Sequence, residues 1–303
     1  MTSSSPIHIA FVSDHNYFHF VLIALHSLLH YHRNGNLVVH LIRPDEVSQD
    51  TEKLLSLRQV APFELITHRL DRQKFVKEFG SDRPTLWRLA IPELILDTDK
   101  LLYLDCDLVF CDDVAKLWGI DLKGNMIAAV GDRAGRKVKL PGLDANHYIN
   151  AGVMLWDLKR MRDENVMDTW KRVFREHNCT LKYLDQTLLN IVHRNNILMI
   201  PQNWNLHNSI YRNPPLAGMY TDAETIEALA NPGIVHFTGH HKPWMLWKFT
   251  HHPYAYRFWQ FALKAPVPLS FKFKILLKRC LTSSMHEPKV KRAWNASIIK
   301  KNV

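Results

Sequence analysis

Two carboxylates separated by a single residue, Asp105 and Asp107, lie within an otherwise apolar run over 101–110. A run this apolar predicts a buried strand, in which residues i and i+2 point to the same face. The two carboxylates would therefore point together, at or just past the end of the strand. Like charges in a low dielectric repel, and a divalent cation such as Mg²⁺ or Mn²⁺ removes that penalty. The alternative is a loop pair that caps a turn and faces water.

Other acidic residues follow predicted strands elsewhere in the chain. Asp14 ends a β-rich run over 7–14, and Asp132 comes just after the apolar strand predicted over 126–130. In open α/β sheets, ligands bind beyond the carboxyl ends of the strands. One such acid would be unremarkable, but four at one rim favour a binding site.

A third candidate ligand, His236, lies in a short apolar strand that ends at Gly239, three residues before Lys242. A metal bound by two carboxylates and one imidazole keeps positions open for phosphate oxygens. Lys242 would add a point charge, and the backbone at Gly239 could approach a phosphate because no Cβ intervenes. This combination favours a nucleotide diphosphate whose leaving-group charge is neutralised by metal and lysine.

The periodicity of the chain predicts the elements that must position these residues. Apolar or alternating runs predict strands over 7–14, 37–43, 63–70, 101–110, 126–130, 153–158, 197–200 and 234–239. Helical spacing predicts helices over 18–31, 45–57, 83–96, 159–177 and 185–193, with Pro84 at the start of the third and Pro92 disturbing its middle. This alternation predicts an α/β fold class with a parallel-dominated sheet.

Two segments have no clear periodicity. The polar, basic stretch 133–147 predicts a loop, for which an active-site flap and a plain surface loop are equal alternatives. The polar stretch 214–232 predicts an excursion from the fold.

The net charge of +10 is unevenly distributed over the 303 residues. Residues 266–303 hold nine Lys or Arg and one acid, Glu287, so this segment carries +8 of the total. We therefore expect a catalytic domain over 1–265 and a basic tail over 266–303. The four cysteines show no Cys-x-x-Cys spacing, and no signal peptide is evident, which fits a reducing cytosol.

Several common nucleotide and hydrolase motifs are absent from the sequence. There is no Gly-x-x-x-x-Gly-Lys-Ser/Thr loop and no Gly-x-Gly-x-x-Gly after the first strand, which weighs against ATPases and dinucleotide dehydrogenases. There is also no Gly-x-Ser-x-Gly nucleophile elbow.

Six motifs occur in a recognisable order. They are Phe-Val-Ser-Asp-His-Asn-Tyr at 11–17, Leu-Trp-Arg-Leu at 86–89, Leu-Tyr-Leu-Asp-Cys-Asp at 102–107, Ile-Asn-Ala-Gly-Val at 149–153, Leu-Asp-Gln at 184–186, and His-Phe-Thr-Gly with Lys-Pro-Trp over 236–244. Together they make the chain resemble the family-8 glycosyltransferases, the retaining, metal-dependent nucleotide-sugar enzymes of GT-A fold. The resemblance covers nearly everything from residue 7 to residue 244.

The resemblance implies a role for each motif. It implies that the uracil nucleotide is held by Val12, Asp14, Asn16 and Tyr17, and the metal by Asp105, Asp107 and His236, with Cys106 between the two acids. It implies a sugar pocket made by Arg88, Asn150, Ala151, Gly152 and Asp185, with Gln186 under the anomeric carbon. It implies a diphosphate clamp at Gly239 and Lys242. Cys106 and the pair at 240–241 depart from the residues usual in the family.

The expected activity is transfer of galactose or glucose from a UDP-sugar, with Mn²⁺ or Mg²⁺, to a glycan acceptor such as lipopolysaccharide core. Because the residue placed beneath the sugar is Gln186, a poor nucleophile, a front-face displacement is favoured over a covalent intermediate. The alternatives are a metal-dependent nucleotidyltransferase or pyrophosphatase acting on nucleotide sugars, and a non-catalytic basic binding module.

The tail predicts a peripheral membrane segment. Leu269, Phe273, Leu276, Leu277 and Cys280 share one arc of a helical wheel, with Lys274 and Lys278 largely opposite and Phe271 and Ile275 breaking the pattern. A basic amphipathic helix of this kind is attracted to anionic lipid. We therefore expect a cytoplasmic protein at the inner face of the cell membrane with a lipid-linked acceptor and no nucleic-acid partner, whereas a solvated terminus is the alternative.

Overall fold

A computed structural model describes residues 5–45, 48–212, 218–239, 242–245 and 254–281. Its strands are β1 (Ile7–Val12), β2 (Leu37–Arg43), β3 (Glu64–Arg69), β4 (Lys100–Leu104), β5 (Leu108–Phe110), β6 (Ile127–Gly131), β7 (Ile149–Asp157), β8 (Ile197–Met199) and β9 (Ile234–His236). Its α-helices are α1 (Phe18–Tyr31), α2 (Ser48–Ser56), α3 (Arg72–Phe79), α4 (Ile91–Leu94), α5 (Val114–Trp118), α6 (Leu158–Asp163), α7 (Val166–Glu176), α8 (Leu184–Val192), α9 (Asn208–Arg212), α10 (Asp222–Ala230), α11 (Ala255–Lys264) and α12 (Leu269–Leu281). Short 3-10 helices are η1 (Leu57–Gln59), η2 (Pro84–Ala90), η3 (Arg133–Lys137) and η4 (Gln202–Asn205).

A seven-stranded sheet in the order β3-β2-β1-β4-β7-β6-β8 forms the centre of the molecule. Strands β1 to β4 run parallel to one another, and β6 and β8 also pair in parallel. Only β7 in this sheet runs antiparallel to both of its neighbours, β4 and β6. The predicted parallel-dominated α/β fold is therefore confirmed.

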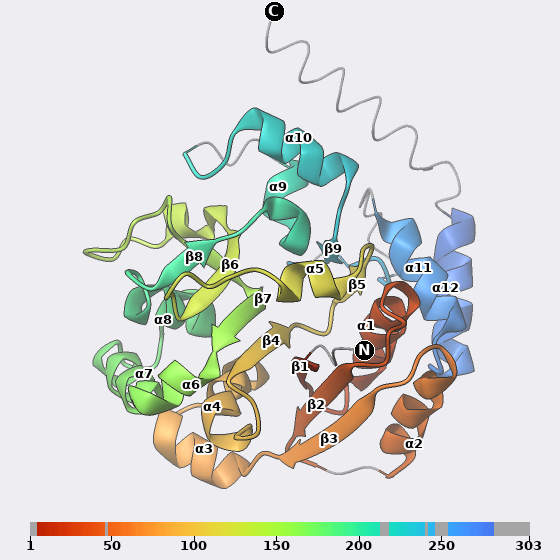
Figure 1. Ribbon diagram of the computed structural model, residues 1–303, viewed down its shortest axis with the longest axis horizontal. Coiled ribbons are helices and arrows are strands. Elements are labelled where there is room, and N and C mark those ends of the chain that lie inside the picture. Colours follow the sequence, from red (N-terminus) through yellow and green to blue (C-terminus); the bar gives the residue numbers. More distant parts are fainter. Residues whose placement is uncertain (1–4, 46–47, 213–217, 240–241, 246–253, 282–303) are drawn as a thin grey trace, which may run out of the picture.

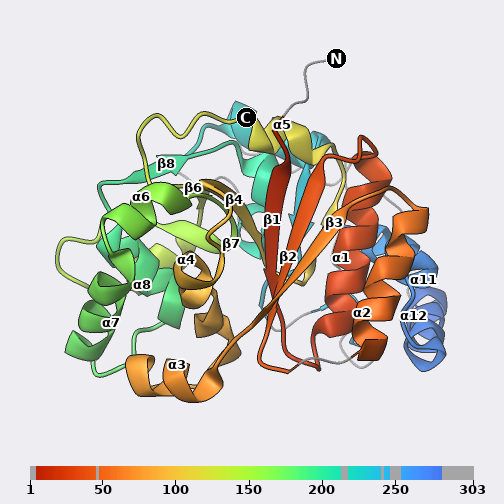
Figure 2. The same cartoon turned by 60° about the horizontal axis from the view of Figure 1, so that its bottom comes forward.

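Helices cover both faces of the sheet (Figure 1, Figure 2). Helices α1, α2, α11 and α12 lie on one side, and α3, α4, α6, α7 and α8 lie on the other (Figure 2). Successive side chains of β4 point to opposite faces of the sheet. Leu102 and Leu104 pack in the core beneath α1, whereas Leu101 and Tyr103 pack in the core on the other face. A strand buried on both faces needs apolar residues at every position, which explains the continuous apolar runs in the sequence.

The sequence predicted one strand over 101–110, but the structure has two strands there. Strand β4 ends at Leu104, and β5 leaves the main sheet to pair antiparallel with β9, so that Leu108 lies opposite His236. The residues between them hold the two carboxylates. The backbone N–H of Asp105 donates to Gly152 of β7 at 2.8 Å, and the carbonyl of Asp107 accepts from Phe237 at 2.9 Å. The two acids thus stand where the chain passes from one sheet to the other.

Three other predicted elements differ from the structure. The helix predicted over 83–96 is a 3-10 turn, η2, followed by the four-residue helix α4, because Pro92 has no N–H to donate to the Arg88 carbonyl and so interrupts a continuous helix. The helix predicted over 159–177 is broken at Asn165, which has a left-handed φ of 48°. The excursion over 214–232 contains α10, which is started by a Thr221–Glu224 capping box.

The described part of the tail is helix α12. Its inner face packs on the body, where Ile275 is fully buried and Phe271 contacts the same core. Its predicted apolar arc faces outward, and Leu269 and Phe273 are 82% and 69% exposed. Lys278 lies opposite that arc and is buried, so it does not contribute to an exposed basic face. Residues 282–303 of the predicted membrane segment lie outside the described residues.

Among the helices that the structure describes, none is long and apolar enough to cross a membrane.

Candidate active site

A cavity of about 950 Å³ opens at the rim where β4, β6, β7 and β9 end or begin. It is lined by two groups of predicted site residues. One group contains Asp105, Asp107, His236, Gly239 and Lys242, and the other contains Arg88, Asn150, Ala151, Gly152, Asp185 and Gln186. Residues 133, 134, 136 and 137 also line it, so part of the segment predicted as a loop or flap belongs to the cavity wall.

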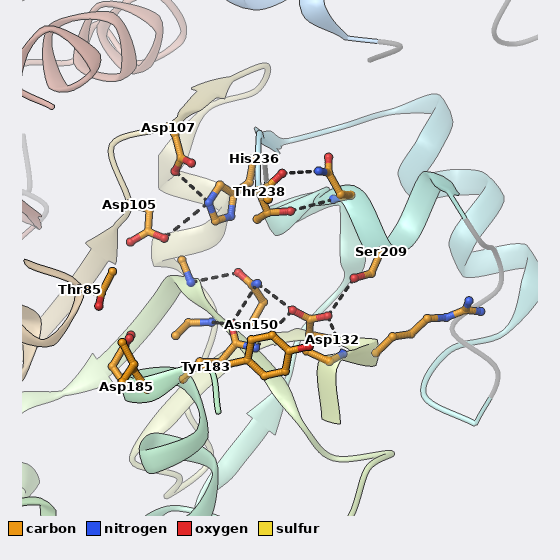
Figure 3. Close-up of a pocket in the computed structure, with 18 of the residues that line it drawn as sticks. Thr85, Asp105, Asp107, Asp132, Asn150, Tyr183, Asp185, Ser209, His236 and Thr238 are labelled. Atoms are coloured by element: carbon orange, nitrogen blue, oxygen red, sulfur yellow. Dashed lines mark hydrogen bonds and ion pairs between the residues drawn. The ribbon is translucent and has the colours of Figure 1, made fainter. Parts of the chain in front are cut away.

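Asp105, Asp107 and His236 converge into a candidate metal site (Figure 3). His236 Nε2 lies 3.0 Å from Asp107 Oδ1 and 3.5 Å from Asp105 Oδ2, and one ligand atom from each residue lies within 4.8 Å of the others. All three side chains line the cavity, and His236 is otherwise buried. Two oxygen ligands and one imidazole with open positions suit a divalent cation.

His236 is oriented by Asn205. Its Nδ1–H donates to Asn205 Oδ1 at 3.0 Å, and Asn205 Nδ2 donates in turn to Asn150 Oδ1 at 2.9 Å. In the neutral ring, this bond leaves the Nε2 lone pair facing the oxygens of Asp107. Two lone pairs this close repel each other, and a cation bound by both groups would remove that repulsion. Such an outer hydrogen bond is typical of metal-ligating histidines. The residues present therefore fit a metal.

Gly152 makes room for this ring. A Cβ at position 152 would lie 2.0 Å from His236 Cε1 and 2.9 Å from Asp105 Oδ2. Atoms in normal van der Waals contact are about 3.5–4.0 Å apart, so no other residue fits here without displacing His236. The glycine of the Asn-Ala-Gly motif thus contacts the metal cluster, although the sequence placed it only in the sugar pocket.

Lys242 completes the cluster by pairing with Asp107 and donating to the Phe237 carbonyl at 2.5 Å. Burial acts to raise the pKa of the Asp107 carboxyl, but the positive charge of Lys242 holds it well below its usual range. Asp107 is therefore ionised and ready to bind a cation at neutral pH. Gly239, the other residue of the predicted diphosphate clamp, adopts a left-handed φ of 77°, which favours glycine.

Arg88 joins the metal cluster to the sugar side of the cavity. Its guanidinium lies 2.9 Å from Asp105 Oδ1 and 3.2 Å from Asp185 Oδ2, and it donates to the Ala151 carbonyl at 2.7 Å. It also stacks over the ring of Tyr103, whose hydroxyl donates to Asp105. Burial raises the pKa of Asp185 more than Arg88 lowers it, so that the pKa lies at about 6.

Gln186 is held in a fixed orientation by three neighbours. Its Oε1 accepts from Asn150 Nδ2 at 3.2 Å and from the Ala151 N–H at 3.3 Å, and its Nε2 donates to Asp132 Oδ2 at 3.4 Å. Asp132 also accepts from Asn150 at 2.9 Å and from Ser209 at 2.9 Å. The carboxamide oxygen is thus already engaged by two N–H donors.

The residues predicted to hold the nucleotide form a separate group at the end of β1. Asp14 Oδ1 accepts from the Tyr17 N–H at 2.8 Å and Asp14 Oδ2 from Asn16 at 3.5 Å, while Cys106 Sγ donates to the Val12 carbonyl at 3.4 Å. None of these five residues lines the cavity. Tyr17 is half-exposed, and burial, Lys242 and Asp107 all act on the pKa of its hydroxyl, which is raised. The group therefore adjoins the metal cluster.

The site contains four residues that the sequence analysis did not predict: Asn205, Ser209, Thr85 and Tyr183. Asp132 was predicted only as an acid at the end of a strand. Asn205 lies beneath the cavity, whereas the others line it. The one signal for Asn205 was its place in a polar stretch that follows a predicted strand.

A family model described as glycosyl transferase family 8 matches residues 8–248. The chain is 34% identical over 179 residues to general stress protein A of Bacillus subtilis (strain 168), covering 55% of this chain and 60% of that protein. It is 25% identical over 266 residues to lipopolysaccharide 1,2-glucosyltransferase of Escherichia coli (strain K12), covering 82% and 75%. It is 30% identical to glycosyltransferase GlyF of Streptococcus pneumoniae serotype 4 (strain ATCC BAA-334 / TIGR4), covering 50% and 35%.

Solved structures share the fold. The galactosyltransferase LgtC in complex with donor and acceptor sugar analogues matches with a TM-score of 0.74 and 24% identity, covering 88% of this chain and all of that one. The bifunctional glycosyltransferase WbbM matches with a TM-score of 0.75 and 20% identity, covering 91% and 53%. These similarities confirm the GT-A fold predicted from the sequence. Because the family model spans most of the 303 residues, and five of the six motifs contribute residues to one cavity, the chain belongs to glycosyl transferase family 8.

Proposed function

We propose that this protein is a retaining, metal-dependent hexosyltransferase that moves galactose or glucose from a UDP-sugar to a glycan acceptor, such as lipopolysaccharide core. One observation carries the proposal. The cluster of Asp105, Asp107, His236 and Lys242 shares a single cavity with a polar pocket that contains Arg88, Asp185 and Gln186. One end has the chemistry to hold a diphosphate, and the other has the hydrogen-bonding groups to hold a sugar.

The metal ligands in this proposal are Asp105, Asp107 and His236, with Mn²⁺ or Mg²⁺ as the ion. When bound, the cation neutralises charge that develops on the leaving diphosphate. Lys242 adds a second positive charge to the same group, and Gly239 leaves its backbone accessible. Val12, Asp14, Asn16 and Tyr17 bind the uracil nucleotide beside the cluster, next to Cys106.

On the sugar side, Arg88, Asn150, Ala151, Gly152 and Asp185 line the pocket, and Gln186 lies beneath the anomeric carbon. We favour front-face displacement, in which the bond to UDP breaks first and the acceptor hydroxyl enters from the same face. The departing β-phosphate takes the acceptor proton. The hydrogen bonds that already engage the Gln186 oxygen favour a positioning role over attack on the sugar.

The acceptor is proposed to be lipid-linked and reached from the cytoplasmic face of the membrane. We also propose that the catalytic domain ends at residue 265 and that residues 266–303 form a separate membrane-binding tail. The supporting observation is the exposed apolar arc of α12, which contains Leu269, Phe273, Leu276 and Leu277, with Lys274 and Arg279 also exposed on the helix. Apolar residues and basic charge together bind anionic lipid surfaces.

The decisive experiment incubates the protein with a panel of UDP-sugars, Mn²⁺ and candidate acceptors, and measures the released nucleotide. A transferase releases UDP, whereas the alternative nucleotidyltransferase or pyrophosphatase releases a monophosphate or pyrophosphate. Asp105→Asn should abolish UDP release, while Asp112→Asn, which changes a surface carboxylate paired with Lys116, should not. Activity that persists in chelator, or at the wild-type level in Asp105→Asn, would refute the proposal.

Gln186→Ala tests the mechanism separately. Loss of a positioning residue should leave measurable transfer, whereas loss of a covalent nucleophile should abolish it. Complete loss of transfer by a folded Gln186→Ala protein would contradict front-face displacement.

A further inference from the structure

The described part of the chain contains a second group of side chains that could hold a metal ion. It consists of His8 on β1, His40 on β2 and Asp97 in the turn before β4, and each offers a ligand atom within 4.8 Å of the others. None of the three lines the active-site cavity. His8 is the second residue of β1, so it lies about 13 Å along the strand from Val12, where β1 reaches the catalytic cluster.

The sheet register builds this group. Ala10 pairs with His40, and Ile42 pairs with His68 on β3, so the three histidines step diagonally across neighbouring strands on one face of the sheet. His8 Nδ1 lies 2.9 Å from His40 Nε2, and His40 Nδ1 lies 2.9 Å from His68 Nε2. The rings stack with centroids 5.3 and 5.2 Å apart. They form a continuous row of hydrogen-bonded imidazoles.

The hydrogen-bond partners of the three imidazoles determine their tautomers. The ring of His68 donates to the backbone of Leu94, so its Nε2 accepts from the Nδ1–H of His40. A neutral His40 then carries its lone pair on Nε2, which points toward His8. A metal-ligating histidine characteristically donates its other N–H to a fixed partner, as His40 does to His68.

Charge and exposure also favour a cation here. The carboxylates of Asp97 and Glu64 both act on His8, and Asp97 is exposed at the surface while His40 is fully buried. A cation arriving from solvent would meet Asp97 first.

We propose that His8, His40 and Asp97 bind a divalent transition-metal ion such as Zn²⁺, at a site separate from the catalytic cluster. Two imidazoles and one carboxylate with an open position suit Zn²⁺, Ni²⁺ or Cu²⁺. The catalytic cluster, with two carboxylates, suits harder ions instead. His68 is a positioning residue that fixes the tautomer of His40.

Zn²⁺ binding to the untagged full chain, measured by equilibrium dialysis with metal analysis, tests this site. Asp97→Asn changes an exposed side chain and should weaken one Zn²⁺ site by at least about tenfold. His8→Gln should lower the number of bound ions by one. The matched control Asp99→Asn, two residues away and also exposed, should bind like the wild type. Mn²⁺-dependent UDP release should be unchanged in Asp97→Asn, which separates this test from the proposed transferase activity.

His68→Phe tests the positioning role, because it keeps all three ligands and removes the partner of His40. Zn²⁺ affinity at this site should fall about 10–100-fold. Circular dichroism verifies that each variant is folded. Unchanged Zn²⁺ stoichiometry and affinity in both Asp97→Asn and His8→Gln would overturn the site, and unchanged affinity in His68→Phe would overturn the role of His68.

Discussion

Adding one methyl group at Gly152 should disable the catalytic cluster without replacing any charged residue. The new Cβ of Gly152→Ala would lie 2.0 Å from His236 Cε1, 2.7 Å from His236 Nδ1 and 2.9 Å from Asp105 Oδ2. Normal contact requires about 3.5–4.0 Å, so the His236 ring must move by about 1.5 Å or more. That displacement breaks its 3.0 Å hydrogen bond to Asn205 and moves Nε2 away from Asp107.

The magnitude follows from these contacts. Overpacking a close-packed interior costs about 1–3 kcal/mol, and the lost hydrogen bond costs about 1 kcal/mol more. At roughly 2–4 °C per kcal/mol for a chain of this size, the melting temperature should fall by on the order of 10 °C. A 1 Å misplacement of a catalytic group costs about 100-fold, so kcat/KM for UDP release should fall at least that far.

Thermal unfolding, Mn²⁺ titration and UDP release measure these effects on the same protein sample. Gly119→Ala is the matched control, because its φ is −69°, its Cβ would approach only the carbonyl oxygens of Ala115 and Lys116, at 3.3 and 3.8 Å, and it does not line the cavity. The control should keep wild-type Mn²⁺ affinity and kcat/KM. If Gly152→Ala also keeps them, His236 does not hold the metal from the position described.

Other substitutions test the clamp, the buried acid and the tail. Lys242→Met should lower kcat for UDP release about 100-fold, because it removes a charge that stabilises the leaving group. Because the pKa of Asp185 is raised to about 6, the folded state retains a proton that the unfolded chain loses above about pH 4, so stability falls as the pH rises through this window. In metal-free protein, Asp185→Asn should reduce the loss of unfolding free energy over this pH window by about 3 kcal/mol, as measured by urea titrations. Identical pH profiles of unfolding free energy for the wild type and the variant would refute this prediction. Phe273→Asp should reduce sedimentation with anionic liposomes, whereas Val76→Asp, at an exposed site on α3, should not.

Local patterns in the sequence were sufficient to predict most elements. The helix over 18–31 and the strand over 37–43 have the bounds predicted for them. Their period of apolar residues depends only on neighbours along the chain, and both elements are long enough to show it. The motif order was also sufficient to identify the family and to name many of the residues that line the cavity.

The breaks in the predicted elements needed the tertiary structure. Pattern alone joined β4 and β5 into one strand, because both are apolar and nothing between them forbids extended backbone. The division arises because β5 pairs with β9, which is 124 residues farther along the chain. Helix α7 likewise starts anew after Asn165, where a left-handed φ is not visible in the spacing of apolar residues.

The sequence by itself indicated many of the side chains that line the cavity, since carboxylates, an imidazole and a lysine near strand ends favour one common site. Tertiary structure alone decided how they are held. The pairing of Leu108 with His236 brings the histidine beside Asp107, Asn205 fixes its ring, and Gly152 leaves space for it. Each of these contacts joins residues far apart in the chain. These contacts depend on the register of strands that are distant in sequence and on side-chain packing, and neither can be predicted from a local sequence pattern.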